Sequence, residues 1–186
     1  MAEVNIPRLD LNDYVYGTPE QKKKFSDDLG KAYNDTGFVT IANHGLSPQL
    51  IEELYHEVKN FFALPEATKL AYEKPELAGQ RGYTSKGKEK AKDSKTPDLK
   101  EFWQRGQTVS DGDVVKNEYP DNIDVRENPR FNSVTREVYE SLEASGKHLL
   151  RAIANYLALP ENYFDNKVHN GNSILRAIHY FPIEDP

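Results

Sequence analysis

Apolar side chains recur every three or four residues in three segments, which predicts three amphipathic helices. The first has the clearest start, because Thr18 can cap it, Pro19 suits the first helical position and Gln21 completes a capping box. Gly37 then ends it, since glycine readily adopts the backbone conformation that follows a helix. The three predicted helices cover residues 18–37, 47–64 and 128–158.

Other parts of the chain carry short extended or helical signals. Residues 4–11 form an extended opening in which Pro7 suits an edge position. Strands are predicted at 38–42 and within 98–106, where Leu99, Glu101 and Trp103 alternate with Lys100, Phe102 and Gln104. Short helical segments are predicted at 65–73 and 160–165. This mixture of helices and strands predicts an α+β fold.

The final stretch, 172–186, has the alternation of a strand. One face carries Ile174, Arg176, Ile178 and Tyr180, and the other carries Leu175, Ala177, His179 and Phe181. Because both faces are mostly apolar, we expect a strand that is covered on both sides and needs neighbours. The sequence that follows Tyr180 is too short to supply a neighbour, so we expect the strand to be unpaired in this chain.

Composition narrows the class of protein. Apolar residues make up 37% of the chain, against the usual ~45–50%, which favours the polar outer part of a larger protein or a loop-rich domain. A net charge of −6 gives no field that would attract nucleic acid or anionic membranes. The chain has no cysteine, no signal-peptide pattern and no apolar run of membrane-spanning length. We therefore expect a soluble, cytoplasmic protein with no nucleic-acid or membrane partner.

Motifs for metal, phosphate or nucleophilic chemistry are absent from the sequence. None of the five histidines belongs to a His-x-Asp or His-Glu-x-x-His pair, so each is predicted to be structural or exposed, and no metal ligand or catalytic residue is assigned. There is no glycine-rich phosphate loop and no Gly-x-Ser-x-Gly turn. The lysine-rich run 86–95 favours a solvated loop over a contact with an anionic ligand.

Arg176 and Tyr180 are the candidate ligand-binding pair. They lie four residues apart on one strand face, about 13 Å along the strand. An arginine fork can bind a carboxylate at two points, and a tyrosine hydroxyl can complete the recognition. A buried Arg176 held by a structural aspartate or by backbone carbonyls explains the same spacing equally well.

Several blocks, taken together and in order, resemble a known family. They are Ile6-Pro-Arg-Leu-Asp-Leu11, Gly37-Phe-Val-Thr-Ile-Ala-Asn-His-Gly45, Phe61-Phe-Ala-Leu-Pro65, Gly82-Tyr83 with Asp98-Leu-Lys-Glu-Phe-Trp103, and Leu175-Arg-Ala-Ile-His-Tyr180. The chain resembles the N-terminal half of the isopenicillin N synthase-like, 2-oxoglutarate- and iron(II)-dependent oxygenases. Residues 1–186 would then be the N-terminal region, with 172–186 as the first strand of a truncated jelly-roll core, the double-stranded β-helix of that family.

The resemblance implies iron(II), 2-oxoglutarate and oxygen as cofactor and cosubstrates. Iron is held in that family by a His-x-Asp pair and a distant histidine, and an Arg-x-Ser pair binds the oxoacid. The chain has none of these, so we expect it to be a truncated or partly resolved oxygenase that is inactive by itself.

The resemblance also transfers roles to single residues. Tyr180 matches a tyrosine that hydrogen-bonds an oxoacid or substrate carboxylate, and Arg176 shares its inward face. Phe102 and Gln104 match a strand that lines the substrate entrance, although core packing explains them equally well. His44 belongs to a structural Asn-His-Gly turn.

The function implied is a small-molecule hydroxylase or related oxidoreductase. Two alternatives stay open. One is a non-catalytic binding or structural module, against which an unpaired apolar terminal strand would argue. The other is an oxidase of the same family that does not use 2-oxoglutarate.

Overall fold

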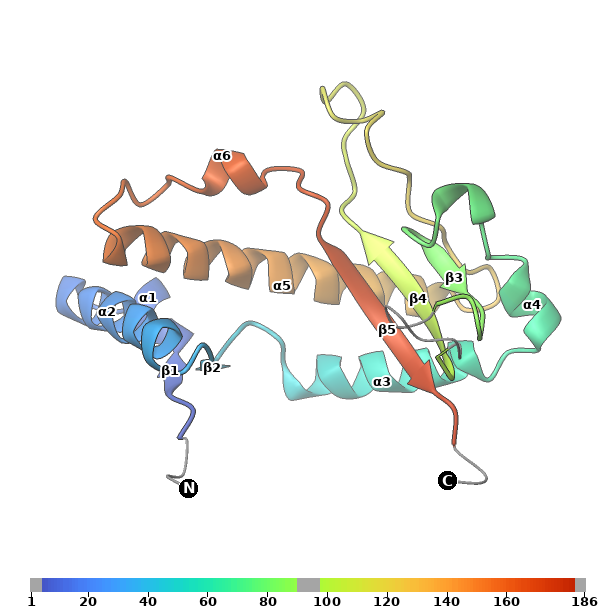
Figure 1. The fold of residues 1–186 in the computed structure, drawn as a ribbon, viewed down its shortest axis with the longest axis horizontal. Coiled ribbons are helices and arrows are strands. Elements are labelled where there is room, and N and C mark those ends of the chain that lie inside the picture. Colours follow the sequence, from blue (N-terminus) through green and yellow to red (C-terminus); the bar gives the residue numbers. More distant parts are fainter. Residues whose placement is uncertain (1–4, 90–97, 183–186) are drawn as a thin grey trace. The chain divides into compact units, whose positions relative to one another are not determined.

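The computed structural model describes residues 5–89 and 98–182, so parts of the stretches 4–11, 86–95 and 172–186 lie outside the described residues. Helices and strands alternate irregularly along the chain (Figure 1), as expected for an α+β fold. The elements are β1 (Arg8–Asp10), α1 (Leu11–Val15), α2 (Pro19–Asp35), β2 (Thr40–Ala42), α3 (Pro48–Phe62), α4 (Glu66–Leu70), the 3₁₀ turn η1 (Pro75–Leu77), β3 (Gly82–Thr84), β4 (Lys100–Gly106), α5 (Pro129–Tyr156), α6 (Asp165–Val168) and β5 (Ile174–Tyr180).

The chain forms two compact units. One contains residues 1–47 and 140–169, and the other contains residues 48–139 and 170–186. Helix α5 belongs to both, with its first part in the second unit and the remainder in the first.

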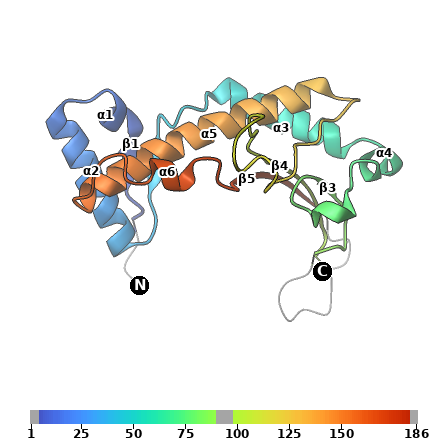
Figure 2. The same cartoon turned by 90° about the horizontal axis from the view of Figure 1, so that it is seen from above.

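The first unit is built on α1, α2 and the C-terminal part of α5, which lie side by side in Figures 1 and 2. The packing of α2 on α5 depends on Gly30, because a Cβ there would lie 2.4 Å from the ring of Tyr156. The Tyr156 hydroxyl also accepts a hydrogen bond from the Asn34 amide at 2.8 Å. The buried side chains of this unit are Leu11, Tyr14, Phe25, Leu29 and Ala152.

The start of α2 follows the sequence prediction. The Thr18 side chain accepts a hydrogen bond from the Gln21 backbone N–H, and the Gln21 side chain accepts one from the Thr18 N–H, so the capping box is confirmed. The helix ends at Asp35, and Gly37 follows with a φ of +74°.

The extended segments of this unit are shorter than predicted. Only Arg8–Asp10 forms a strand before the chain turns into α1, because Asp10 caps that helix by accepting from the Asn12 N–H at 2.9 Å. Strand β2 contains only Thr40–Ala42, and Phe38 lies outside it with 66% of its surface exposed. The strands β1 and β2 pair in parallel.

The second unit contains a three-stranded antiparallel sheet in the order β3–β4–β5. Its first strand begins at Gly82, whose φ is +78° and where a Cβ would lie 2.7 Å from both Ile123 and the Tyr72 carbonyl. The prediction of an unpaired terminal strand is wrong, because β5 pairs with β4 over all seven residues. The partner precedes β5 in the sequence, and α5 lies in the long connection between the two strands.

An aromatic core covers one face of this sheet. Trp103 of β4 is 1% exposed and lies 4.9 Å from Phe61 of α3, measured between ring centroids. Phe61 stacks in turn on Phe131 of α5, also at 4.9 Å. The Asn128 side chain accepts from the Phe131 N–H, which fixes the start of α5 at Pro129 as predicted. Phe62, Tyr72, Tyr83 and Val125 complete the core.

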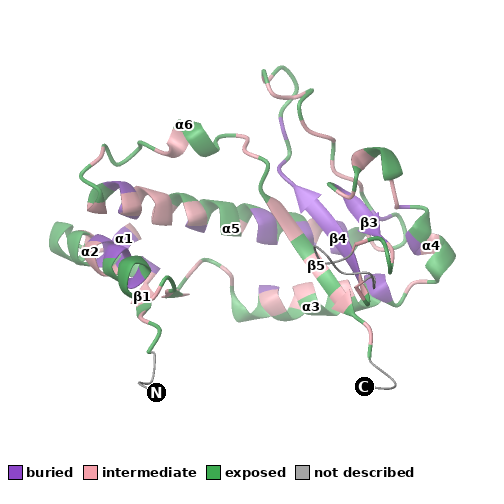
Figure 3. Ribbon diagram, viewed as in Figure 1, coloured by how far each residue is buried: buried purple, intermediate pink, exposed green. Residues whose placement is uncertain are grey.

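Strand β5 is covered on one face only, which corrects the prediction of a strand covered on both. Ile178 and Tyr180 are 42% and 65% exposed, whereas Ala177 on the other face packs against the aromatic core. Figure 3 shows β4 buried along most of its length and β5 alternating between intermediate and exposed. The reason is that helices α3 and α5 supply side chains to one face of the sheet, the face of Trp103.

Two short helical predictions are shifted. Helix α4 ends at Leu70 rather than near Glu73. Residues 160–164 form a turn, and the helix α6 follows it. Among the described helices, none combines the length and apolar character that a membrane crossing needs.

Candidate functional site

The sheet register brings three of the four predicted ligand-binding residues together. Phe102 lies opposite Ile178 in the β4–β5 pair, and Gln104 lies opposite Arg176. Residues directly opposite each other point to the same face of an antiparallel sheet. Phe102, Gln104 and Arg176 therefore share the face that points away from α3 and α5, which we call the open face. On this face Phe102 and Gln104 are themselves buried, at 2% and 6% exposed.

Contacts to neighbouring residues fix the position of Arg176. Its Nε donates to Gln104 Oε1 at 3.1 Å, and its guanidinium carbon lies 4.2 Å from the centroid of the Phe102 ring. Its Nη1 lies 3.4 Å from Glu89 Oε2, and the Gln104 amide donates to the Gly79 carbonyl. These contacts hold the arginine in place with 35% of its side chain exposed.

Tyr180 shares the open face with Arg176 but not its position. It lies opposite Lys100, at the other end of the strand pair, and is about 13 Å from Arg176 along β5. Lys100 is held by ion pairs with Asp98 at 2.9 Å and Glu89 at 3.0 Å. The open face therefore offers two polar positions separated by Ile178, and a single small carboxylate would not reach both.

The covered face holds a buried charged cluster that the sequence analysis missed. Glu101 is 1% exposed, and its Oε2 accepts hydrogen bonds from Lys69 at 2.7 Å and from the Tyr83 hydroxyl. Its Oε1 lies 2.8 Å from Nδ1 of His179. We call these four residues the Glu101 cluster.

The electrostatics of the cluster favour an ionised carboxylate. Burial by itself would raise the pKa of Glu101, but the hydrogen bonds from His179, Lys69 and Tyr83 outweigh it, so the pKa lies below the ordinary glutamate value. The pKa of Tyr83 is raised, first by burial and then by its bond to Glu101. A proton therefore stays on the tyrosine and the negative charge stays on Glu101.

A sequence signal for this cluster exists. Glu101 alternates on one face with Leu99 and Trp103, and a carboxylate on an apolar strand face needs partners if it is buried. What the alternation does not reveal is their identity, because Lys69, Tyr83 and His179 come from three other elements.

An iron site of the two-histidine, one-carboxylate kind needs three converging donors. Within residues 5–89 and 98–182, no group of three His, Cys, Asp or Glu side chains is placed to hold a metal ion. The described residues therefore do not fit an iron ion by themselves. His44 lies in a turn, where its Nδ1 accepts from the Leu46 N–H at 3.4 Å.

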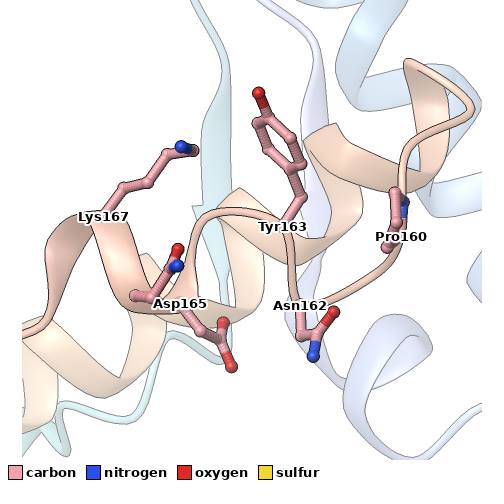
Figure 4. Close-up of a pocket in the computed structure, with 6 residues that line it drawn as sticks. Pro160, Asn162, Tyr163, Asp165 and Lys167 are labelled. Carbon is pink, nitrogen blue, oxygen red and sulfur yellow. The ribbon is translucent and has the colours of Figure 1, made fainter.

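Two depressions in the first unit are weaker candidates. One, of about 390 Å³, is lined by helix α6 and the turn before it, and there Lys167 lies 4.9 Å from the ring centroid of Tyr163 (Figure 4). Its Asp165 is already paired with Arg151 at 2.6 Å, which lowers the pKa of that carboxyl. The other, of about 570 Å³, follows β1 and β2. Neither contains any of the four predicted ligand-binding residues.

Comparison with known proteins identifies the family. Residues 6–126 match the family described as the non-haem dioxygenase in morphine synthesis N-terminal domain. A 2-oxoglutarate-dependent dioxygenase, frbA, of Dothideomycetidae sp. (strain 11243) is 28% identical over an alignment of 189 positions, which covers 95% of this chain and 55% of the relative. The proline hydroxylase buaE of Petromyces alliaceus is 30% identical over an alignment of 182 positions, which covers 95% of this chain and 56% of the relative.

Solved structures agree with the sequence comparison. A 2OG-Fe(II) oxygenase family protein from Caulobacter crescentus superimposes with a TM-score of 0.86 at 33% identity, covering 99% of this chain and 59% of that one. A full-length Neurospora crassa protein crystallised in complex with alpha-KG gives a TM-score of 0.78 at 26% identity, covering 95% of this chain and 56% of that one.

The chain spans about half the length of the curated relatives it matches. The family match, over residues 6–126, covers most of the chain. The chain belongs to the 2-oxoglutarate- and iron(II)-dependent oxygenase family, within which it corresponds to the N-terminal region.

Proposed function

We propose that the protein carrying this chain is a 2-oxoglutarate- and iron(II)-dependent oxygenase that oxidises a small organic molecule. The observation that carries the proposal is the open face, on which Arg176 is fixed and Tyr180 exposed in a chain of this family. In the proposal β5 is the first strand of a jelly-roll core, the open face points toward its interior, and oxygen is the second cosubstrate.

The two ends of the open face receive different roles. Tyr180 is proposed to hydrogen-bond a carboxylate of 2-oxoglutarate or of the substrate. Arg176 and Gln104 are proposed to bind polar groups of the substrate, with Phe102 as the flat surface beneath the guanidinium. The separation of about 13 Å favours two ligands or one long ligand.

A small organic substrate is supported by a solved relative. The full-length Neurospora crassa protein, 25–26% identical to this chain, has been crystallised with alpha-KG together with 5-formyluracil or thymine. The substrate proposed for this protein is therefore a small molecule, and thymine itself is not assigned.

The chemistry is divided between the iron and the chain. Iron, which the described residues do not hold by themselves, would supply oxygen activation coupled to decarboxylation of the oxoacid. The residues of this chain bind and orient the organic ligands, and the apolar Ile178 and Phe102 exclude water from the space between the two polar positions.

The test is 2-oxoglutarate turnover by the whole protein. We expect succinate to form when iron(II), oxygen and 2-oxoglutarate are present, and its formation to stop when iron is chelated. Oxygen consumption that does not depend on 2-oxoglutarate would favour the oxidase alternative. Failure of the iron-loaded protein to bind 2-oxoglutarate would contradict the proposal and favour a non-catalytic module. The pairing of β5 with β4 weakens the aggregation argument against such a module, because only one edge of β5 stays unpaired within the described residues.

A further inference from the structure

The two oxygens of Glu101 have different partners. Oε2 accepts from Lys69 of α4 and from Tyr83 of β3, two elements that precede β4. Lys69 is itself 7% exposed and also donates to the Phe62 carbonyl at 3.2 Å. One side of the carboxylate is therefore anchored in the core, while Oε1 faces β5.

His179 is the residue of β5 that this carboxylate holds. Its Nδ1 lies 2.8 Å from Glu101 Oε1. Its ring also lies near the rings of Phe62 and Phe181, with centroid distances of 5.4 and 4.8 Å. The imidazole is thus held by one hydrogen bond to a buried charge and by contacts with two aromatic rings.

Tyr180 directly follows His179 and points to the opposite face of the strand. Within the described residues, β5 pairs with β4 along one edge only. Two side-chain hydrogen bonds join β5 to β4 within the described residues. Arg176 bonds Gln104 near the start of β5, and His179 bonds Glu101 near the end of β5. Backbone bonds also hold this end, among them the bond from the Phe181 N–H to the Leu99 carbonyl at 3.1 Å. The His179–Glu101 bond adds a side-chain link to the buried carboxylate directly next to Tyr180.

We propose that Glu101 and His179 are positioning residues for Tyr180. Glu101 is anchored in the core and restrains His179 of β5 through their hydrogen bond. This restraint holds the Tyr180 hydroxyl in the position where it binds a ligand on the open face. This inference rests on the proposed role of Tyr180 in binding 2-oxoglutarate. A displaced or mobile tyrosine reduces the apparent affinity by the fraction of time that it spends out of place.

Two variants separate the hydrogen bond from the ring. His179→Phe keeps an aromatic ring near Phe62 and Phe181 but removes the donor. His179→Asn removes the ring but places an amide nitrogen where Nδ1 stood. Tyr83→Phe is the matched control, because it removes a donor from the same carboxylate without touching β5.

The measurements are the dissociation constant of 2-oxoglutarate in the iron-loaded whole protein, the Tm, and hydrogen exchange of the β5 amides. We expect His179→Phe and Tyr83→Phe to lower the Tm by comparable amounts. Only His179→Phe should weaken 2-oxoglutarate binding, by roughly three- to tenfold, and speed exchange at 178–181. His179→Asn should restore the affinity. If His179→Phe does not fold, His179→Leu takes its place in the comparison with His179→Asn. Leucine matches asparagine in shape but has no hydrogen-bond donor.

Two results would overturn the inference. One is unchanged hydrogen exchange of β5 in His179→Phe, and the other is an equal loss of affinity in Tyr83→Phe. The Tyr180→Phe variant distinguishes failure of this inference from failure of the proposed function. If that variant binds 2-oxoglutarate normally, the ligand role of Tyr180 is wrong, and the exchange data alone then decide whether Glu101 and His179 hold the strand.

Discussion

The guanidinium of Arg176 lies over the ring of Phe102, with 4.2 Å between its central carbon and the ring centroid. This cation–π contact joins adjacent strands across the open face and leaves the edge of the guanidinium directed at Gln104 and Glu89. The arrangement fixes the arginine before any ligand binds, which reduces the entropy that binding has to overcome.

Arg176→Met should separate substrate binding from cosubstrate binding. Because the methionine keeps the apolar contact with Phe102 but loses the charged donors, we expect the KM of the organic substrate to rise about tenfold or more. The affinity for 2-oxoglutarate should change by less than about twofold, since Tyr180 is about 13 Å away. Steady-state kinetics of the whole protein measure both. Arg136→Met, at an exposed position of α5, is the control, and an equal effect there would refute the assignment.

Tyr180→Phe should weaken 2-oxoglutarate binding. A neutral hydrogen bond is worth about 0.5–1.5 kcal/mol, or about two- to twelvefold in affinity, and more when the partner is a carboxylate. Titration calorimetry with the iron-loaded protein measures the change. Tyr16→Phe, at a tyrosine that is 82% exposed in the first unit, should bind normally. Unaltered affinity in Tyr180→Phe would remove Tyr180 from the site.

Glu101→Gln should destabilise the fold in a pH-dependent way. The substitution leaves buried Lys69 without its ionised partner, which costs about 3–5 kcal/mol at neutral pH. Since the folded pKa of Glu101 lies below the ordinary 4.5, the carboxylate stabilises the folded protein above that pH, and the contribution is lost as the pH falls through the folded pKa.

Urea unfolding at pH 7, 5 and 3.5 tests this dependence. The difference between wild type and Glu101→Gln should be largest at pH 7 and smaller at pH 3.5. Exposed Glu118→Gln should show a small difference at every pH. A difference for Glu101→Gln that stays constant with pH would contradict the ionised state assigned to the cluster.

Phe61→Ala should be among the costly core substitutions. The ring is fully buried and contacts Trp103 and Phe131 at 4.9 Å each, so its removal should cost about 3–5 kcal/mol. Tyr55→Ala on the same helix, at a residue 63% exposed, should change the unfolding free energy by only about 0.5 kcal/mol or less. Denaturant unfolding compares the two, and similar costs would contradict the observed burial.

Thr18→Ala should weaken the start of α2. The capping box satisfies two backbone donors, and the loss of the side-chain acceptor costs about 1 kcal/mol. Thr18→Ser keeps the side-chain oxygen, so its free energy of unfolding should differ from that of the wild type by only about a few tenths of a kcal/mol. Chemical unfolding followed by circular dichroism measures both variants, and equal stability of the alanine variant would show that the cap contributes nothing.

The sequence predicted the elements that local patterns define. The Thr18 cap, the Pro48 start of α3 and the two strands that contain Phe102 and Tyr180 all lie close to where periodicity put them. The predicted site residues also proved to share one face. Their ligand role stays a prediction, which the variants of Arg176 and Tyr180 test.

What the sequence did not predict depends on distant segments. The pairing of β4 with β5 joins residues more than sixty positions apart, and alternation within either strand carries no information about its partner. The short α1 was missed because its helical signal is a single capped turn after a strand.

For this protein, the sequence by itself determined the α+β class, the main helix and strand positions and the family, since each rests on local periodicity or on ordered motifs. Only the tertiary structure decided which face of β5 is covered and that Glu101 remains charged in the core. The physical reason is that burial and charge stabilisation depend on groups brought together by folding. Lys69, Tyr83, Glu101 and His179 come from four elements, and no pattern along the chain connects them.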